Sequence, residues 1–183
     1  SNLGRFLAIL CIVMLGAGFL AGLKVTRKAM LKTLNSYNAE SRFFDFRMIS
    51  TLGLTEDDVS YFASLPGVET AEGSTETDAL FEMPDDMESV LKVHSMPKSI
   101  NTPLLRSGRL PQSENECVLD AFYFGEDVIG KTITLSERND SQRLDLFGGR
   151  TYTVVGLVNS PLYINFTRGT TTLGSGSVRG FVY

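Results

Sequence analysis

The chain has 183 residues, of which 43% are hydrophobic and 21% charged, and a net charge of −4. This length allows one ordinary domain, or a small domain with an appendage. The hydrophobic fraction excludes a disordered chain. The acidic balance excludes a nucleic-acid binder that depends on phosphate neutralisation, so we expect no nucleic acid among the partners.

The charge is distributed unevenly along the chain. Residues 1–39 contain five basic residues and no acidic residue, which leaves residues 40–183 with a net charge of −9. The chain therefore consists of two chemically different pieces. Cys11 and Cys117 lie one in each piece, so we expect no disulfide framework, and neither CxxC nor Cys/His metal-ligand spacing is present.

An apolar run near the N-terminus predicts a transmembrane helix over residues 5–23. Residues 6–23 are 18 consecutive uncharged residues. As a helix they extend about 27 Å, close to the ~30 Å hydrocarbon thickness of a bilayer. A cleavable signal peptide is the first alternative, but its apolar core would be shorter, about 7–15 residues. A buried core helix is the second, and the absence of a polar face disfavours it.

Four small residues in this run form a candidate helix-packing surface: Ala17, Gly18, Ala21 and Gly22. Small residues spaced four apart let a second helix backbone approach closely in a membrane. The expected partners are other transmembrane helices of the same protein or of a second copy. The alternative is that Gly and Ala are simply common in membrane helices.

Residues 24–39 contain neither Pro nor Gly and predict that the helix continues as a short stalk, with its basic residues among the lipid headgroups. The distribution of basic residues does not settle the orientation. Four of them come after the apolar run and only Arg5 precedes it. Because the sequence starts at Ser1, without Met, we expect a fragment whose upstream loop is missing.

Residues 40–183 predict a mixed α+β domain. Residues 43–52 are aromatic and β-branched and predict a strand. Thr55 predicts a helix N-cap, with Asp58 in the capping-box position and Pro66-Gly67 ending the helix. Further strands are expected within these ranges: 68–83, 89–96, 116–120, 131–135 and 151–159. Residues 102–111 predict a loop, 137–143 a hairpin tip, and 180–183 a short apolar strand.

The sequence displays no catalytic, cofactor or metal-binding motif, so we expect no enzyme. His94 stands alone in a predicted strand, where a histidine is usually structural. Glycines at 148–149 and 174–176 are not followed by the Lys-Ser/Thr of a phosphate loop. The acidic residues Glu82, Asp85, Asp86 and Glu88 lack the ligand spacing of a calcium loop and predict a solvated turn.

Several segments together resemble the FtsX-like (MacB-type) permeases of ABC transporters. The segments are Gly4-Arg5-Phe6-Leu7, Ser50-Thr51-Leu52-Gly53-Leu54-Thr55 with Asp57-Asp58-Val59, Leu65-Pro66-Gly67-Val68, Gly108-Arg109-Leu110-Pro111, residues 115–120 and residues 152–163. Their order and spacing carry the resemblance, which covers nearly the whole chain, while none of the motifs is specific alone.

The resemblance implies a permease subunit in the cell membrane, with the domain after residue 24 extracytoplasmic. The family's external part combines a strand-helix-strand lobe with a smaller β-rich insertion, here about residues 100–160, in a domain of residues 40–183. The implied partner is an ABC ATPase subunit, which binds the ATP. Two other classes remain open: a single-span, membrane-anchored binding or sensor module, and an anchored hydrolase with a pocket uniting His94, a carboxylate and a nucleophile.

Overall fold

The computed structural model describes residues 2–183, which divide into two compact units, one ending at Glu40 and one spanning residues 41–183. The chain is a mixed α+β protein with a long apolar N-terminal helix and a β domain. The predicted fold class is confirmed at this level.

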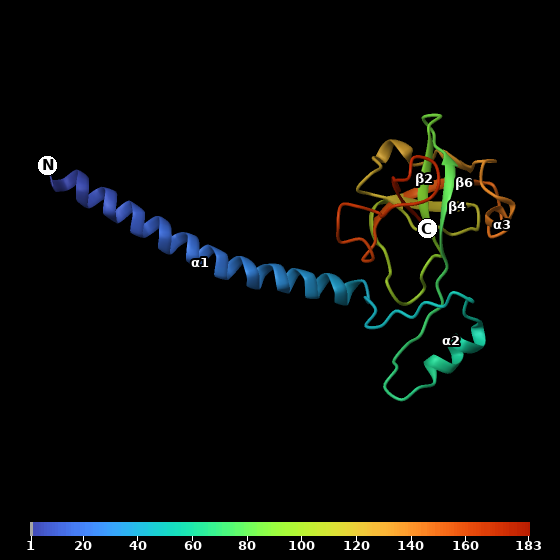
Figure 1. The fold of residues 1–183 in the computed structure, drawn as a ribbon, viewed down its shortest axis with the longest axis horizontal. Helices are drawn as coiled ribbons and strands as arrows, with labels where there is room; N and C mark the ends of the chain where they lie inside the picture. Colours follow the sequence, from blue (N-terminus) through green and yellow to red (C-terminus); the bar gives the residue numbers. More distant parts are fainter. Residues whose placement is uncertain (1) are drawn as a thin grey trace. The chain divides into compact units, whose positions relative to one another are not determined.

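The first unit is one unbroken helix, α1 (Asn2–Glu40), of 39 residues and therefore about 58 Å long (Figure 1). None of its residues is buried, and its most apolar window is long and apolar enough to cross a membrane. A signal sequence near an N-terminus has the same length and composition. A core helix of a soluble protein is mostly buried, which α1 is not.

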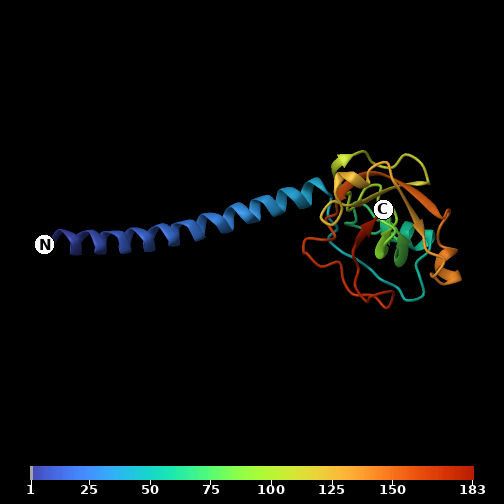
Figure 2. The same cartoon turned by 90° about the horizontal axis from the view of Figure 1, so that it is seen from above.

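The second unit is built on a closed β-barrel (Figure 2). Its strands are β1 (Glu76–Glu82), β2 (Glu88–His94), β3 (Leu104–Gly108), β4 (Glu116–Asp120), β5 (Thr132–Leu135), β6 (Thr151–Asn159) and β7 (Gly180–Val182). They lie in the order β3-β6-β4-β7-β2-β1-β5. Because β5 also pairs with the first half of β6, six strands form a closed ring, and β3 extends it along the second half of β6.

The ring contains both parallel and antiparallel strand pairs. β2 pairs with β7 in parallel, and β4 pairs with β6 in parallel, whereas the other pairs are antiparallel. The late strand β7 is therefore inserted between β2 and β4. β1 and β2, which precede residues 100–160 in the sequence, and β7, which follows them, therefore belong to the same barrel as the strands within that range.

The barrel interior is filled by side chains that alternate along each strand, as expected for a small barrel. Fully buried members are Ala79, Phe81, Leu91, Leu119, Ile133 and Val154. The 3-10 helix η1 (Glu126–Val128) adds Val128 to this cluster. Gly156 in β6 lies against the end of β3. A Cβ atom at residue 156 would be 2.4 Å from the carbonyl oxygen of Arg109, the residue after β3. This contact explains a glycine inside a strand.

Outward-facing side chains of the barrel are partly covered by residues 160–179. Val118, Val155, Val158 and Phe181 form one outer cluster with Tyr183, against which Tyr163 packs. Leu80, Val90 and Val178 form a second outer cluster over β1 and β2. The long segment before β7 therefore acts as a cover for two faces of the barrel.

The predicted strand at 43–52 is wrong, because this segment has no strand partner and remains irregular. Most of this segment belongs to residues 46–70, which we call the lobe. The lobe contains α2 (Glu56–Ala63). Phe46 is 91% exposed and Leu52 98% exposed. Backbone groups without a neighbouring strand cannot form a ladder, whatever the side-chain pattern.

The helix of the lobe begins and caps as predicted. Thr55 is the N-cap, its hydroxyl accepts from the Asp58 N–H at 3.3 Å, and the Asp58 carboxylate accepts from the Thr55 N–H at 2.7 Å. This reciprocal pair is the predicted capping box. No residue of α2 is buried, so capping and not core packing fixes the helix.

Elsewhere in the domain the strand predictions are largely confirmed. β4 and β6 have the predicted bounds, β5 begins one residue later than predicted, and β7 lies in the predicted terminal strand. The loop predicted at residues 102–111 is wrong in part, because this segment contains β3, which pairs antiparallel with β6. The predicted hairpin tip at 137–143 includes the start of α3 (Ser141–Leu144), which the Asp140 side chain caps.

Candidate functional site

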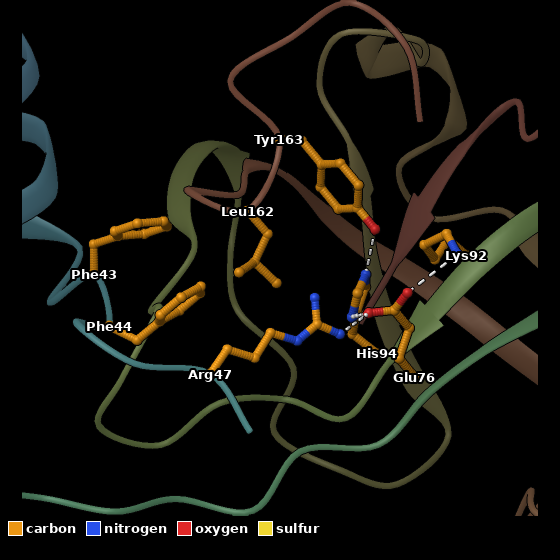
Figure 3. Close-up of a pocket in the computed structure, with 8 residues that line it drawn as sticks. All are labelled: Phe43, Phe44, Arg47, Glu76, Lys92, His94, Leu162 and Tyr163. Atoms are coloured by element: carbon orange, nitrogen blue, oxygen red, sulfur yellow. Dashed lines mark hydrogen bonds and ion pairs between the residues drawn. The ribbon is translucent and has the colours of Figure 1, made fainter. Parts of the chain in front are cut away.

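A cavity of about 180 Å³ opens beside the N-terminal end of β1, and we call it the His94 pocket (Figure 3). Its walls come from three parts of the domain: the segment at the root of the lobe, the β1–β2 pair, and the loop after β6. The lining residues are Phe43, Phe44, Arg47, Glu76, Lys92, His94, Leu162 and Tyr163.

The register of β1 and β2 brings the charged residues of this pocket together. Glu76 lies directly opposite His94, and Asp78 directly opposite Lys92. All four side chains share the outer face, because residues two apart in a strand point the same way. Lys92 Nζ lies 3.1 Å from Glu76 Oε1 and 2.9 Å from Asp78 Oδ1.

Arg47 adds a second cation from outside the sheet. Its Nη2 donates to Glu76 Oε2 at 2.9 Å (Figure 3). Burial alone would raise the pKa of Glu76, but the hydrogen bond from Lys92 and the nearby positive charges outweigh burial and hold this pKa below its usual value. Glu76 is therefore ionised, and it links Lys92 of the barrel to Arg47 at the root of the lobe.

His94 is the most buried titratable group of the pocket, with a side chain that is 2% exposed. Its Nε2 lies 2.6 Å from the Tyr163 hydroxyl, and its Nδ1 lies 3.9 Å from Glu76 Oε2, beyond hydrogen-bond distance. Burial lowers the pKa of His94 to about 4, and the attraction of Glu76 only partly opposes this. His94 is therefore neutral at pH 7 and ties the loop after β6 to β2.

The pocket lacks the arrangement that an anchored hydrolase would need. His94 meets a carboxylate and a hydroxyl here, but Glu76 is engaged by Arg47 and Lys92 and does not orient the imidazole. The hydroxyl belongs to Tyr163, whose pKa is raised by burial, which opposes its activation as a nucleophile. The lining residues include no Ser, Thr or Cys. The geometry suits a structural latch or the binding of a small polar group.

The four small residues of α1 lie on one exposed side of the helix. Ala17, Gly18, Ala21 and Gly22 are all exposed, and within residues 2–183 a Cβ atom built at either glycine would meet nothing closer than 4 Å outside the helix backbone. There is therefore room for a second helix to approach. Their role in helix packing stays a prediction.

The other residues singled out in the sequence have structural roles. Asp85 accepts from the Met87 N–H in the β1–β2 turn, and Glu88 pairs with Arg138 at 2.6 Å. Within residues 2–183, no group of three or more His, Cys, Asp or Glu side chains could hold a metal ion. Cys11 and Cys117 are not disulfide-bonded, and burial raises the pKa of Cys117 to about 12.

Sequence reasoning missed most of the pocket. Acidic residues at 76 and 78 and basic or titratable residues at 92 and 94 have the period of two expected for one face of a strand pair. That pattern could have indicated the Glu76–Lys92 cluster. Arg47 and Tyr163 could not be found this way, because irregular segments bring them to the sheet.

A buried ion pair fixes the loop that carries Tyr163. Arg168 Nε donates to Asp120 Oδ2 at 2.5 Å, and both side chains are at most 5% exposed. The Arg168 guanidinium also lies 5.1 Å from the ring centre of Tyr163. This pair links the end of β4 to the segment that covers the barrel.

Comparison of the chain with family models, curated proteins and solved structures finds no match.

Proposed function

We propose that this chain is a permease subunit of an ABC transporter of the FtsX-like (MacB-type) family. In this proposal α1 anchors the subunit in the cell membrane, and the domain after residue 24 is extracytoplasmic. ATP hydrolysis by a partner ATPase drives conformational change in that domain, in export or in mechanotransmission. The transported or regulated molecule is not part of the proposal.

The observation that carries the proposal is the continuity of α1. The apolar segment of residues 5–23 and the basic segment of residues 24–39 form one helix without a break. A rigid rod that leaves the bilayer can pass a displacement to the next segment of the chain, whereas a flexible linker would absorb it. A signal sequence would not require this second, basic half to be helical.

The lobe offers a second line of support. Its exposed apolar side chains, among them Phe46, Ile49 and Leu52, suit a surface that contacts further protein in an assembly. A permease that assembles with a second copy of itself provides such a contact on the same side of the membrane. The segment also includes the Ser50–Val59 stretch on which the family resemblance rests.

The first experiment asks whether the full-length protein is anchored and whether it co-purifies with an ABC ATPase. The tagged protein should remain in membranes after alkaline extraction and retain its N-terminal helix, whereas the double variant Ile12→Arg/Leu15→Arg should be released. Co-purification of an ABC ATPase would support the permease. A stable single-span protein without such a partner would contradict it.

Helix packing can be tested within the same preparation. Gly18→Leu/Gly22→Leu should reduce crosslinking of α1 to other transmembrane helices, because bulky side chains separate the backbones. Gly16→Leu is the matched control, since residue 16 is about 200° from residue 18 around the helix. Equal crosslinking in both variants would remove this surface from the proposal.

A single-span, membrane-anchored binding module is the second candidate. The observation that favours it is the His94 pocket, which is lined by charged and aromatic side chains. The same co-purification experiment separates the two candidates, because a binding module needs no ATPase.

A further inference from the structure

A larger hollow, of about 650 Å³, lies over the outer face of β1 and β2, and we call it the arginine groove. Its apolar floor is formed by Leu80, Val90 and Val178. The later part of the segment that covers the barrel, residues 167–179, forms one wall, and we call this part the cover segment. A hollow of this size is within the range of small-ligand sites, about 300–1,000 Å³.

Three arginines line this groove, and they come from separate parts of the chain: Arg138, Arg168 and Arg179. Glu88 is the one carboxylate among its lining residues. Arg138 pairs with Glu88 at 2.6 Å and Arg168 pairs with Asp120 at 2.5 Å, so these two charges are balanced within the protein. Among residues 2–183, Arg179 has no carboxylate within hydrogen-bond distance, so it provides the positive charge that attracts an anion.

Arg179 presents donors that the protein does not use. Among residues 2–183, one of its five N–H groups donates to a side chain, Ser89 Oγ at 3.1 Å. Its nearest carboxylate, Asp85, is 3.9 Å away, too far for a hydrogen bond. The guanidinium lies 5.5 Å from the ring centre of Phe124, which holds it in place.

Arg168 is positioned by the protein before any ligand arrives. Asp120 engages its Nε and Nη2, and the Asn165 carbonyl accepts from its Nη1. These bonds use three of its five N–H groups. The buried pair therefore fixes one edge of the guanidinium and contributes a rigid part of the groove wall.

The cover segment is shaped closely to the floor of the groove. Gly174 has a positive φ of +52°, and a Cβ atom there would lie 3.2 Å from Val90 and 3.3 Å from Leu80. Ser175 and Ser177 beside it are exposed and line the groove with hydroxyl groups. The wall therefore combines close approach to an apolar floor with two hydroxyl groups, which lie 3.2 Å from each other.

We propose that the arginine groove binds a small organic anion that bears a carboxylate or a phosphate. Arg179, with Arg138 at the rim, binds the anionic group, because guanidinium groups pair bidentately with both oxyanions. Ser175 and Ser177 bind its polar substituents. This site does not depend on the permease proposal.

The test uses the full chain, labelled with ¹⁵N-glycine, in nanodiscs of phosphatidylcholine. The chain has 17 glycines, so the amide spectrum is sparse, and Gly169 and Gly174 line the groove. Citrate and inorganic phosphate are the probes, against chloride at equal ionic strength. Either probe should shift the Gly169 and Gly174 signals in a saturable way, while Gly53 and Gly67 in the lobe stay unchanged.

Variants assign the binding to the arginines. Arg179→Gln should weaken binding about tenfold, since it removes charge-assisted hydrogen bonds. Arg138→Gln, at a residue with a 73% exposed side chain, should weaken it about threefold and guards against misfolding of the first variant. Arg143→Gln is the matched control, because Arg143 pairs with Asp140 and does not line the groove.

Two outcomes would overturn the proposal. One is the absence of a saturable shift with either probe up to about 10 mM, a range that covers weak binding. The other is binding by Arg179→Gln and Arg138→Gln that equals that of the wild-type chain. Preference for citrate or for phosphate would identify the oxyanion that the groove selects.

Discussion

The barrel and the lobe are neighbours in sequence, but they treat apolar side chains in opposite ways. In the barrel, Phe81 is 1% exposed and Phe181 is fully buried. In the lobe, Phe46 and Leu52 are more than nine-tenths exposed, and α2 has no buried residue. Each barrel strand finds a partner within residues 76–182, so the barrel is stable by its own contacts, whereas the lobe depends on local capping.

The residues that flank the lobe are nevertheless fixed by hydrogen bonds to the rest of the domain. The Phe44 N–H donates to the Asn101 side chain at 3.1 Å. The Glu72 carboxylate accepts from the backbone N–H groups of Lys98, Ser99 and Ile100 at 2.6 to 2.9 Å. The lobe is therefore held at its base and exposed along its length, which suits a contact surface better than a core.

The largest expected contrast is between a barrel core residue and a lobe residue of the same type. Phe81→Ala should lower the free energy of unfolding by about 3–5 kcal/mol, because it removes a buried ring and leaves a cavity. Phe46→Ala should change it by less than about 0.5 kcal/mol. Urea unfolding of the detergent-solubilised chain, followed by near-UV circular dichroism, measures both. Equal losses would show that the lobe is part of the core.

The buried ion pair tests how firmly the cover segment is attached to the barrel. Asp120→Ala should destabilise the domain by about 3 kcal/mol, because it leaves Arg168 buried without its carboxylate. The double variant Asp120→Leu/Arg168→Met should be less destabilised, since neither charge remains. The same urea titration compares them, and a double variant that is worse than the single would refute the desolvation argument.

Acid should weaken the barrel unit through His94. Burial lowers the pKa of His94 to about 4 in the folded state, whereas an unfolded histidine has a pKa of about 6.5. Between these values the unfolded state binds more protons, so stability falls as the pH falls. From pH 7 to pH 5 the loss is about 2 kcal/mol. Urea unfolding at both pH values measures it, and the loss should be absent in His94→Gln.

Other charged groups around His94 set the limits of that experiment. Arg47, Lys92, Glu76 and Asp78 all face it, and the pKa of Glu76 is held below its usual value, so Glu76 stays ionised over the range compared. The comparison is therefore made at pH 7 and pH 5. An unchanged pH dependence in His94→Gln would assign the effect to another group.

The smallest expected effect is confined to the lobe. Thr55→Ala removes the capping hydroxyl and should destabilise α2 by about 1 kcal/mol. Amide exchange in α2 should become about fivefold faster, while the barrel amides keep their protection. Hydrogen exchange read by mass spectrometry measures this. Faster exchange in the barrel as well would show that the two regions unfold together.

Local sequence signals predicted the parts of the fold whose causes are local. The capping box at Thr55 and the alternation of residues 151–159 each have a local origin, and each is found where predicted. Residues 43–52 have a strand-like composition but find no partner strand, and residues 104–108 form a strand because β6 lies beside them. Closure of the barrel depends on pairings between distant segments, which no local pattern specifies.

The candidate site divides in the same way. The Glu76–Lys92 and Glu76–His94 contacts result from the register of one hairpin. Tyr163 and Arg47 reach the pocket from irregular segments 69 residues after and 47 residues before His94. Their positions depend on the Asp120–Arg168 pair and on the base of the lobe, so only the folded domain reveals them.

The place of β7 in the barrel has a consequence for biosynthesis. Residues 180–182 lie between β2 and β4, so the ring cannot close until they have left the ribosome. Synthesis proceeds at roughly 5–20 residues per second, so β2 lacks its partner strand on one edge for several seconds. By then the whole of α1 has long been synthesised. The order of synthesis thus exposes a strand edge that chaperones would need to protect until the barrel closes.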